Sequence, residues 1–297
     1  MPWRRRVKPP DAQTSAFEAQ RPRLLRLAYR MLGSTAEAED VVQDAWLRWR
    51  RVDREKVREP AAFLTRTVTR LCLDAMKSAR ARRESYVGSW LPEPILEPEE
   101  EIRPDELTLT LMLALERLSP LERAAFLLHD VFGVPLDEVA ATLKREAAST
   151  RQLAVRARQH IREARPRFPV PREEGDRIAQ AFFRASHGGD IAALRSLLAE
   201  NVVVHADGGG KVLAFRNPIV GMEKVLRMFQ GLARKRKPDF LMQPGWIDGL
   251  PGYVSRERGV LQTTALAIED GLVTAVYITR NPDKLAGIAR TMDASLH

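Results

Sequence analysis

Apolar residues recur at helical spacing along the first part of the chain. One face of the first predicted helix carries Leu24, Leu27, Ala28 and Met31. Gly33 stops that helix, and Ser34 can begin the next one because its side chain accepts a hydrogen bond from a first-turn amide. A third helix is expected from Pro60, since proline suits the first helical turn. The pattern therefore predicts an all-α domain, which we place at residues 12–87.

Residues 88–106 interrupt the helical pattern. The segment is acidic and holds four prolines, three of them between residues 92 and 98. Such a composition disfavours a packed element, so we expect an extended linker. Helical spacing then resumes, and Ser119 followed by Pro120 and Glu122 is typical of a helix start. We place a second all-α domain at residues 107–168.

Two helices within the second all-α domain have helix-turn-helix spacing. The first is expected over residues 137–143 and the second from about Ala147, with a short turn between them. The face of the second helix opposite its apolar side carries Ser149, Arg151, Gln152, Arg156 and Gln159. Arginine can read guanine edges in the major groove and glutamine can read adenine. The motif therefore favours DNA binding; the alternative is an ordinary helical hairpin with a solvated charged face.

The pattern changes after residue 172. Two amphipathic helices, over residues 178–183 and 191–198, are followed by strand-like runs at residues 202–205, 212–215, 259–268 and 272–279. Asp270-Gly271 between the last two runs is a strong hairpin signal. Residues 173–297 are therefore predicted to form an α+β domain with an antiparallel sheet.

Charge is distributed unevenly along the chain. Residues 1–90 hold 20 Lys and Arg against 11 Asp and Glu, and residues 107–172 hold 11 against 7. The segment between them, residues 91–106, holds one basic residue against seven acidic ones. Basic blocks attract polyanions, so this distribution favours nucleic acid as a partner. The α+β region, at 16 against 14, is nearly neutral.

Membrane and secretory segments are not expected. The sequence has no run of eighteen apolar residues, and its basic N-terminus is not followed by an apolar stretch. The single cysteine, Cys72, lies in an apolar helical run and is expected to be a small buried hydrophobe. We therefore expect a cytoplasmic protein without a membrane partner.

The segments 38–49 and 118–129 resemble the polymerase-clamp-binding helix and the run before the promoter-reading helices of sigma factors. The chain is similar to the extracytoplasmic-function class of the sigma-70 family, which has two helical domains joined by one linker. Three further motifs, at residues 90–94, 207–211 and 281–285, resemble a subgroup with a C-terminal SnoaL-like domain of the nuclear-transport-factor-2-like (NTF2-like) cone fold. The resemblance implies RNA polymerase core and promoter DNA as partners.

The resemblance also assigns residues to each contact. The polymerase-facing residues would be Asp40, Gln43, Asp44 and Leu47. The melted promoter strand would meet Phe63, Arg66, Arg70, Asp74 and Arg80, although Phe63 is equally suited to the core. The upstream promoter element would meet Lys144, Arg145, Ser149, Arg151, Gln152 and Arg156. Lys144 stands where the family usually has glycine, so it is expected to adopt a left-handed conformation.

Two functions compete for the α+β domain. In the first it is a regulatory module that modulates the sigma factor in cis, with Trp90 and Leu91 of the linker docking near two loops. The residues of this contact would be Trp90, Leu91, Asp207, Lys211, Asn281, Asp283 and Lys284, with glycines 208–210 as a flexible turn. In the second it is a small-ligand sensor or vestigial isomerase-like enzyme, for which the polar candidates are His205, Asp207, Trp246 and Arg258. The sequence shows no nucleophile–base pair and no metal-ligand spacing, so we expect no enzyme activity, metal or cofactor.

Overall fold

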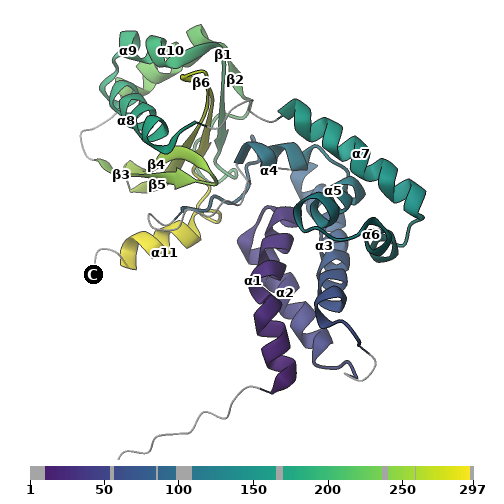
Figure 1. Cartoon of the computed structure of the whole chain (residues 1–297). Helices are drawn as coiled ribbons and strands as arrows, with labels where there is room; N and C mark the ends of the chain where they lie inside the picture. Colours follow the sequence, from purple (N-terminus) through teal and green to yellow (C-terminus); the bar gives the residue numbers. More distant parts are fainter. Residues whose placement is uncertain are drawn as a thin grey trace, which may run out of the picture. The chain divides into compact units, whose positions relative to one another are not determined.

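The computed structural model (Figure 1) describes residues 11–53, 57–84, 86–97, 109–164, 170–235, 240–257 and 259–294. The chain divides into two compact units. The helical unit comprises Met1–Ala81 and Leu118–Gln159, and the sheet unit comprises Arg82–Arg117 and His160–His297. Within the described ranges, no helix is both long enough and apolar enough to span a membrane.

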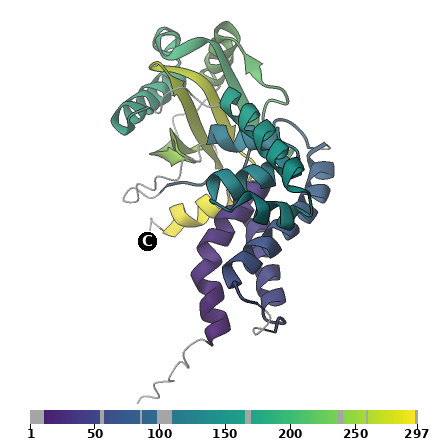
Figure 2. The ribbon, with the colours of Figure 1, turned by 45° about the vertical axis from the view of Figure 1, so that its right-hand side comes forward.

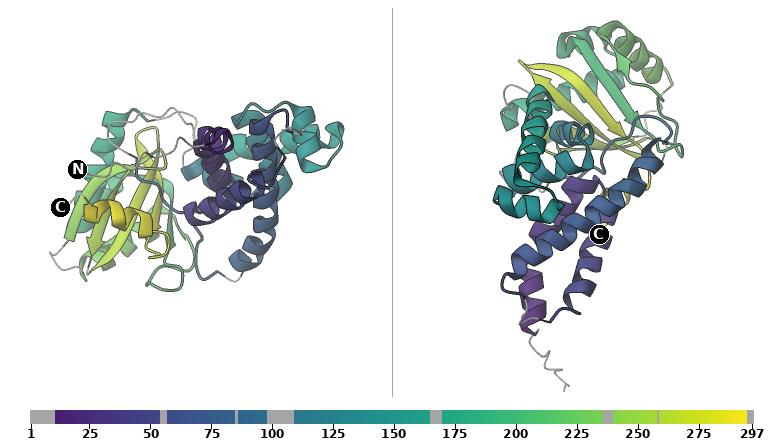
Figure 3. Two further views of the ribbon diagram at one scale, coloured as in Figure 1. Left: turned by 90° about the horizontal axis from the view of Figure 1, so that it is seen from below. Right: turned by 90° about the vertical axis from the view of Figure 1, so that its right-hand side faces the viewer.

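Three helices form the first half of the helical unit, which Figure 3 shows from two further directions. They are α1 (Ala12–Leu32), α2 (Thr35–Trp49) and α3 (Pro60–Glu84). Gly33 ends α1 in the left-handed region at φ 72°, and the Ser34 side chain caps α2 by accepting from the Glu37 amide. Trp49 is buried and its ring lies 5.6 Å from that of Phe63, so α2 and α3 share an aromatic contact.

The second half of the helical unit contains the helix-turn-helix. Its elements are α5 (Pro120–Phe126), the π-helical turn η2 (Leu127–Val131), α6 (Leu136–Leu143) and α7 (Ala147–Ala164). Ser119 and Glu122 form the predicted capping box at the start of α5. Lys144 ends α6 at φ 54° and ψ 48°, which confirms the left-handed conformation predicted for it.

Lys144→Gly is expected to raise the free energy of unfolding of the helical unit by about 0.5–1 kcal/mol. A left-handed conformation costs a side-chain-bearing residue about 1–2 kcal/mol, which exceeds the extra chain entropy of about 0.4–1 kcal/mol that glycine loses on folding. Urea denaturation would measure the change. Arg145→Gly is the matched control: Arg145 does not have a positive φ, so that variant should be destabilised.

The sheet unit is built on six strands in the order β2-β1-β6-β5-β4-β3. They are β1 (Leu198–Asp207), β2 (Ile219–Val220), β3 (Phe240–Ile247), β4 (Leu250–Glu257), β5 (Val260–Glu269) and β6 (Leu272–Thr279). Asp270 and Gly271 form the predicted tight turn, with φ of 51° and 77° between the paired Glu269 and Leu272.

The predicted α+β architecture is confirmed, but three details of the sheet prediction are wrong. The sheet is mixed, because β1 pairs with β6 in parallel while the other pairs are antiparallel. Residues 212–215 lie in a loop, since the Lys211 and Val212 amides donate back to the Gly208 carbonyl and turn the chain. Strands β3 and β4 were not expected, because prolines and glycines within them hide the alternation of apolar and polar residues.

Helices cover both faces of this sheet (Figures 1 and 2). One face packs against α8 (Arg172–Gly188), α9 (Ile191–Leu197) and α10 (Met222–Ala233), with Phe182 and Phe229 in an edge-to-face contact at 5.4 Å. The opposite face packs against α4 (Leu109–Glu116), the linker and α11 (Ala286–Ala294). By their contacts, residues 88–97 of the linker are therefore a structural part of the sheet unit.

Candidate functional site

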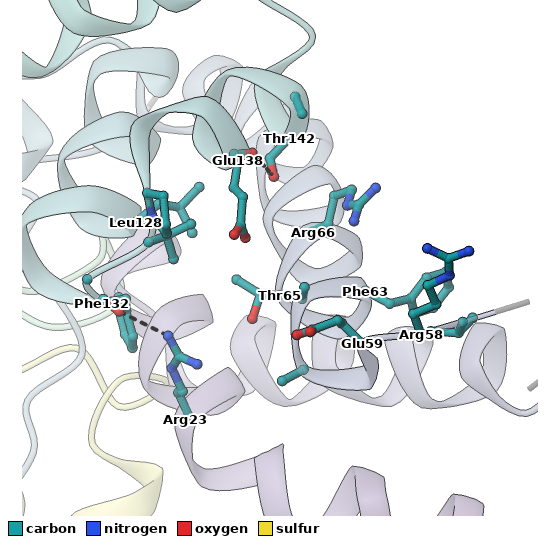
Figure 4. A pocket seen from close by; sticks show the side chains of 17 residues that line it. Arg23, Arg58, Glu59, Phe63, Thr65, Arg66, Leu128, Phe132, Glu138 and Thr142 are labelled. Carbon is teal, nitrogen blue, oxygen red and sulfur yellow. Dashed lines mark hydrogen bonds between the residues drawn. The ribbon is translucent and has the colours of Figure 1, made fainter.

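The helical unit contains a cleft of about 770 Å³ (Figure 4). One wall comes from α1 and the first turns of α3, where Phe63 and Arg66 lie, and the other comes from the η2–α6 segment, with Phe132, Glu138 and Thr142. The predicted strand-binding surface of α3 therefore forms one side of this cleft.

The residues predicted for the melted strand are not all equally available. Phe63 is half-buried, packs on Trp49 and lines the cleft, so both of its expected roles remain compatible with its position. Arg66 is exposed, whereas the Asp74 carboxylate accepts from the Lys77 ammonium at 2.8 Å, a bond that lowers the pKa of Asp74. The Arg80 side chain lies outside the described residues.

Arg70 is held by the other half of the helical unit. Its guanidinium donates to the Thr142 carbonyl at 3.3 Å and to the Ala141 carbonyl at 3.4 Å, at the C-terminal end of α6. Carbonyl groups at a helix end lack partners within the helix and attract a cation. While it makes both bonds, Arg70 cannot offer its full set of donors to a DNA phosphate.

Two more arginines join the same halves of the helical unit. Arg123 of α5 is buried, and its Nε donates to the Arg30 carbonyl of α1 at 2.9 Å. Arg23 donates to the Phe132 carbonyl at 3.0 Å and lies over the Phe132 ring. With Arg70, these bonds stabilise the packing of α5, η2 and α6 against α1 and α3.

The polar face of α7 is exposed. Every residue that was predicted to contact the upstream element is exposed: Lys144, Arg145, Ser149, Arg151, Gln152 and Arg156. The opposite face is buried through Thr150, Ala154 and Ala157. No acidic residue occurs between positions 147 and 162, so the exposed face is suited to a polyanion.

The residues predicted to face the polymerase share one side of α2. Asp40, Gln43, Asp44 and Leu47 are all exposed, and Leu47 retains 45% of its accessible surface. Val41, Val42, Ala45 and Trp49 are buried on the other side. An exposed leucine on the same side of the helix as two carboxylates is consistent with a contact surface rather than with core packing.

A buried carboxylate links the linker to the sheet. Asp207, at the end of β1, is fully buried and accepts from the Leu91 amide at 2.9 Å, the Tyr86 hydroxyl at 2.5 Å and the Gly209 amide at 3.0 Å. It also pairs with the Lys284 ammonium at 2.7 Å. Asp207 thus joins Tyr86 and the linker residue Leu91 to the loop after β1.

The Lys284 side chain completes this contact. Its ammonium also donates to the Leu91 carbonyl and lies 4.3 Å from the centre of the Trp90 ring and 4.9 Å from that of Tyr86. We call the set Tyr86, Trp90, Leu91, Asp207, Asn281 and Lys284 the linker latch. Lys211 and Asp283 were also predicted for this contact. They form a separate, exposed ion pair beside the latch, with 2.6 Å between the Lys211 ammonium and the Asp283 carboxylate.

Tyr86 is a member of the latch that the sequence analysis missed. Its hydroxyl donates to Asp207 and accepts from the Asn281 amide nitrogen at 2.8 Å. Burial and the neighbouring Asp207 raise the pKa of Tyr86 above its usual range, so the hydroxyl stays protonated and can donate. The only available signal was an aromatic residue just before the predicted linker.

The three glycines after Asp207 do not form the flexible turn that was expected. A Cβ atom on Gly209, which has φ 61°, would lie 2.3 Å from the Asn281 amide nitrogen, and one on Gly208 would lie 2.2 Å from the Val212 carbonyl oxygen. Glycine is required here because other segments approach the backbone closely. The loop is therefore a tightly packed part of the latch.

A second anchor holds the following residues of the linker. Leu96 pairs with Ile247 at the edge of β3, and the Asp248 amide donates to the Ile95 carbonyl at 3.0 Å. The Glu97 carboxylate accepts from the Gly249 amide at 2.6 Å. The linker therefore extends the sheet beyond β3 for a few residues.

Of the residues considered for ligand chemistry, His205 and Asp207 lie two positions apart on β1, whereas Trp246 lies on β3 at the far edge of the sheet. His205 stacks on Tyr277 at 5.4 Å, and burial together with Arg117 lowers its pKa. Trp246 donates to Asp176 at 2.8 Å, and Arg258 lies outside the described residues. Among the described residues no group of three His, Cys, Asp or Glu side chains could hold a metal. Cys72 is buried, as predicted, and burial raises its pKa.

Comparisons with known proteins agree with this organisation. Residues 16–82 match the family Sigma-70 region 2, and residues 108–161 match Sigma-70, region 4. The ECF RNA polymerase sigma factor SigJ of Mycobacterium tuberculosis (strain ATCC 25618 / H37Rv) is 36% identical over 294 residues, which cover 93% of this chain and 94% of that protein. The probable ECF RNA polymerase sigma factor SigI of the same strain is 31% identical over 93% of this chain and 95% of its own.

The similarity extends to three-dimensional structure. A crystal structure of Mycobacterium tuberculosis SigJ matches with a TM-score of 0.75 and 34% identity, over 92% of this chain and 98% of that one. Both helical domains and the α+β domain are thus shared with a sigma factor along almost its full length. The chain therefore belongs to the extracytoplasmic-function sigma factors of RNA polymerase, and it carries an α+β domain after its two helical domains.

Proposed function

We propose that the helical unit brings RNA polymerase core to promoters through three surfaces. The exposed face of α2 with Asp40 and Asp44 binds the polymerase, the exposed face of α7 reads duplex in the major groove, and the first turns of α3 hold the melted strand. The exposed polar face of α7, which carries Arg151, Arg156 and Arg162 and no acid between residues 147 and 162, supports this proposal most directly.

The proposal requires the two halves of the helical unit to separate on the promoter. Arg70 is occupied by the carbonyls of α6, and the cleft beside it is bounded on its far side by η2 and α6. A phosphate can replace those carbonyls as the partner of Arg70 only when α6 leaves α3. We infer that polymerase binding supplies the free energy for this step, which requires polymerase to bind the separated halves more tightly than the packed ones.

Asp44→Arg is expected to weaken binding to polymerase core by roughly fivefold, because it replaces an attractive charge with a repulsive one worth about 1 kcal/mol at an exposed site. Fluorescence titration of labelled protein with purified core would measure the change. Glu39→Arg is the matched control, since Glu39 is also exposed on α2 but points about 100° away from Asp40. An equal loss for both variants would contradict a defined polymerase face on α2.

The sheet unit modulates this activity in cis through the linker latch. The observation that carries this part of the proposal is the buried Lys284–Asp207 pair, because both charges also hydrogen-bond the backbone of Leu91. A linker fixed at Leu91 and again at Leu96 cannot extend freely between the two helical domains. Release of the latch would change how far those domains can move apart.

Truncation tests this regulatory role. Transcription from the same promoter would be compared for the full chain, a chain ending after Arg167, and a chain ending before Asn281. The last variant lacks Asn281 and Lys284 but keeps Asp207, so it should release the linker while retaining most of the sheet. Equal transcription and equal polymerase affinity for all three chains would exclude a regulatory role.

A small-ligand site in the sheet unit is a second candidate. Its supporting observation is a pair of buried hydroxyls, Ser255 and Thr264, that have no hydrogen-bond partner within the described structure. They lie on neighbouring strands, on the face that packs against α8, α9 and α10, where an unpaired buried hydroxyl is costly. Thermal-shift screening with small carboxylic acids and ketones would test this candidate, with Ser255→Ala and Thr264→Val abolishing any stabilisation.

A further inference from the structure

An apolar side chain stands in the middle of the exposed face of α7. Val155 retains 54% of its accessible surface, although the other apolar residues of this helix from Leu153 to Ile161 are buried or half-buried. At about 100° per residue, Val155 lies between Arg151 and Gln152 around the helix axis, one turn further along. Its exposed neighbours are therefore basic and amide side chains.

The position of Val155 among basic and amide side chains favours DNA as the partner of this face. The α7 face carries no acidic residue before position 163, so its charge matches a polyanion and not a second protein surface of mixed charge. In the major groove the only apolar group offered by a base pair is the C5 methyl of thymine, which valine-sized side chains can contact. A valine exposed among arginine and glutamine side chains would exclude water from that methyl.

We propose that Val155 contacts the C5 methyl group of a thymine in the upstream promoter element and thereby contributes to base selection. The inference rests on the proposed role of α7 as the reading helix and adds one specificity-determining residue to it. Arg151 and Gln152 supply polar contacts to base edges. Val155 favours thymine over a pyrimidine without the C5 methyl group, such as cytosine.

The test removes the methyl group from the DNA and the valine methyls from the protein separately. Holoenzyme, assembled from the full chain and polymerase core, first selects its promoters from a random duplex pool. Each thymine of the upstream element is then replaced by deoxyuridine, which keeps every hydrogen-bonding group and loses only the methyl. Binding of wild-type and Val155→Ala holoenzyme to each duplex is measured by competition.

At one thymine, deoxyuridine should weaken wild-type binding by about fourfold, the value of one buried methyl-sized group. Val155→Ala should bind the thymine duplex about as weakly and should not distinguish thymine from deoxyuridine. Val220→Ala is the control, because Val220 is 53% exposed and lies in the sheet unit; it should behave as wild type. Deoxyuridine tolerated at every position, or an equal loss for wild type and Val155→Ala, would overturn the inference.

The result also separates this inference from the function on which it rests. If Arg151→Ala relaxes base preference while deoxyuridine has no effect, α7 reads DNA but Val155 does not contact a methyl group. If Arg151→Ala leaves promoter selection unchanged as well, the proposed role of α7 is itself wrong.

Discussion

Lys284→Ala is expected to destabilise the sheet unit by about 3–5 kcal/mol. The variant leaves the fully buried Asp207 carboxylate without its cation, and removing one partner of a buried pair costs far more than the pair contributes. Asp207 would keep only the hydrogen bonds from Leu91, Tyr86 and Gly209. Urea denaturation followed by the fluorescence of Trp90 and Trp246, both in the sheet unit, would measure the loss.

A double-mutant cycle separates the charge pair from the packing around it. Asp207→Asn combined with Lys284→Met removes both charges and keeps similar volumes, so it should recover a large part of the stability lost by Lys284→Ala. Lys211→Ala provides the matched control, because the Lys211–Asp283 pair is more than half exposed on both sides and should contribute at most about 1 kcal/mol. Similar losses for Lys284→Ala and Lys211→Ala would contradict the assignment of the latch.

The same variants report on the linker. Since Lys284 and Asp207 hold both backbone groups of Leu91, their loss should increase amide hydrogen exchange at residues 86–92 before the whole sheet unfolds. Residues near Leu96 should remain protected, because they pair with Ile247 at the second anchor. Faster exchange confined to the first segment would show that the two anchors open independently.

Local chemistry made much of this fold predictable. Ser34 and Ser119 cap helices because their side chains accept from amides three residues ahead, and that signal lies within one helical turn. Lys144 could be placed in the left-handed region because it stands where the family that the chain resembles usually has glycine. The exposed face of α7 followed from its periodicity, since its buried positions recur at helical spacing.

Features that depend on distant segments were not predictable in the same way. The parallel pairing of β1 with β6 joins residues about 70 positions apart, and no local pattern specifies it. Tyr86 belongs to the latch because it hydrogen-bonds Asp207 and Asn281, which lie more than 100 residues later in the sequence. Arg70 was assigned to DNA from its position on α3, but its bonds to α6 depend on how two helical domains pack.

One missed feature did have a local signal. Asp248-Gly249 is the same dipeptide as Asp270-Gly271, and it forms the same tight turn, with φ of 46° and 71° between the paired Ile247 and Leu250. It was overlooked because Pro244 and Pro251 flank it, and proline argues against a central strand. Both prolines are tolerated here within the β3–β4 hairpin, which includes the edge strand β3.

Arg151→Ala is expected to weaken binding to the selected promoter by about 1–3 kcal/mol, or roughly five- to 150-fold, and to relax base preference at one position. Arg151 is exposed on the first turns of α7, where a reading helix meets base edges. An arginine that donates two hydrogen bonds to guanine contributes a free energy of this size. Competition between the selected duplex and single-base variants of it would measure both the loss and the change in preference.

Arg145→Ala gives the comparison that decides what Arg151 does. Arg145 is exposed in the turn before α7, a position suited to a phosphate. Its loss should weaken selected and random duplexes alike and reduce the slope of log affinity against log salt by about one. Arg151→Ala should instead reduce the ratio between the two duplexes, because a contact to a base edge exists only on the selected one. If both variants lower that ratio equally, or if neither does, α7 does not enter the groove in the orientation proposed here.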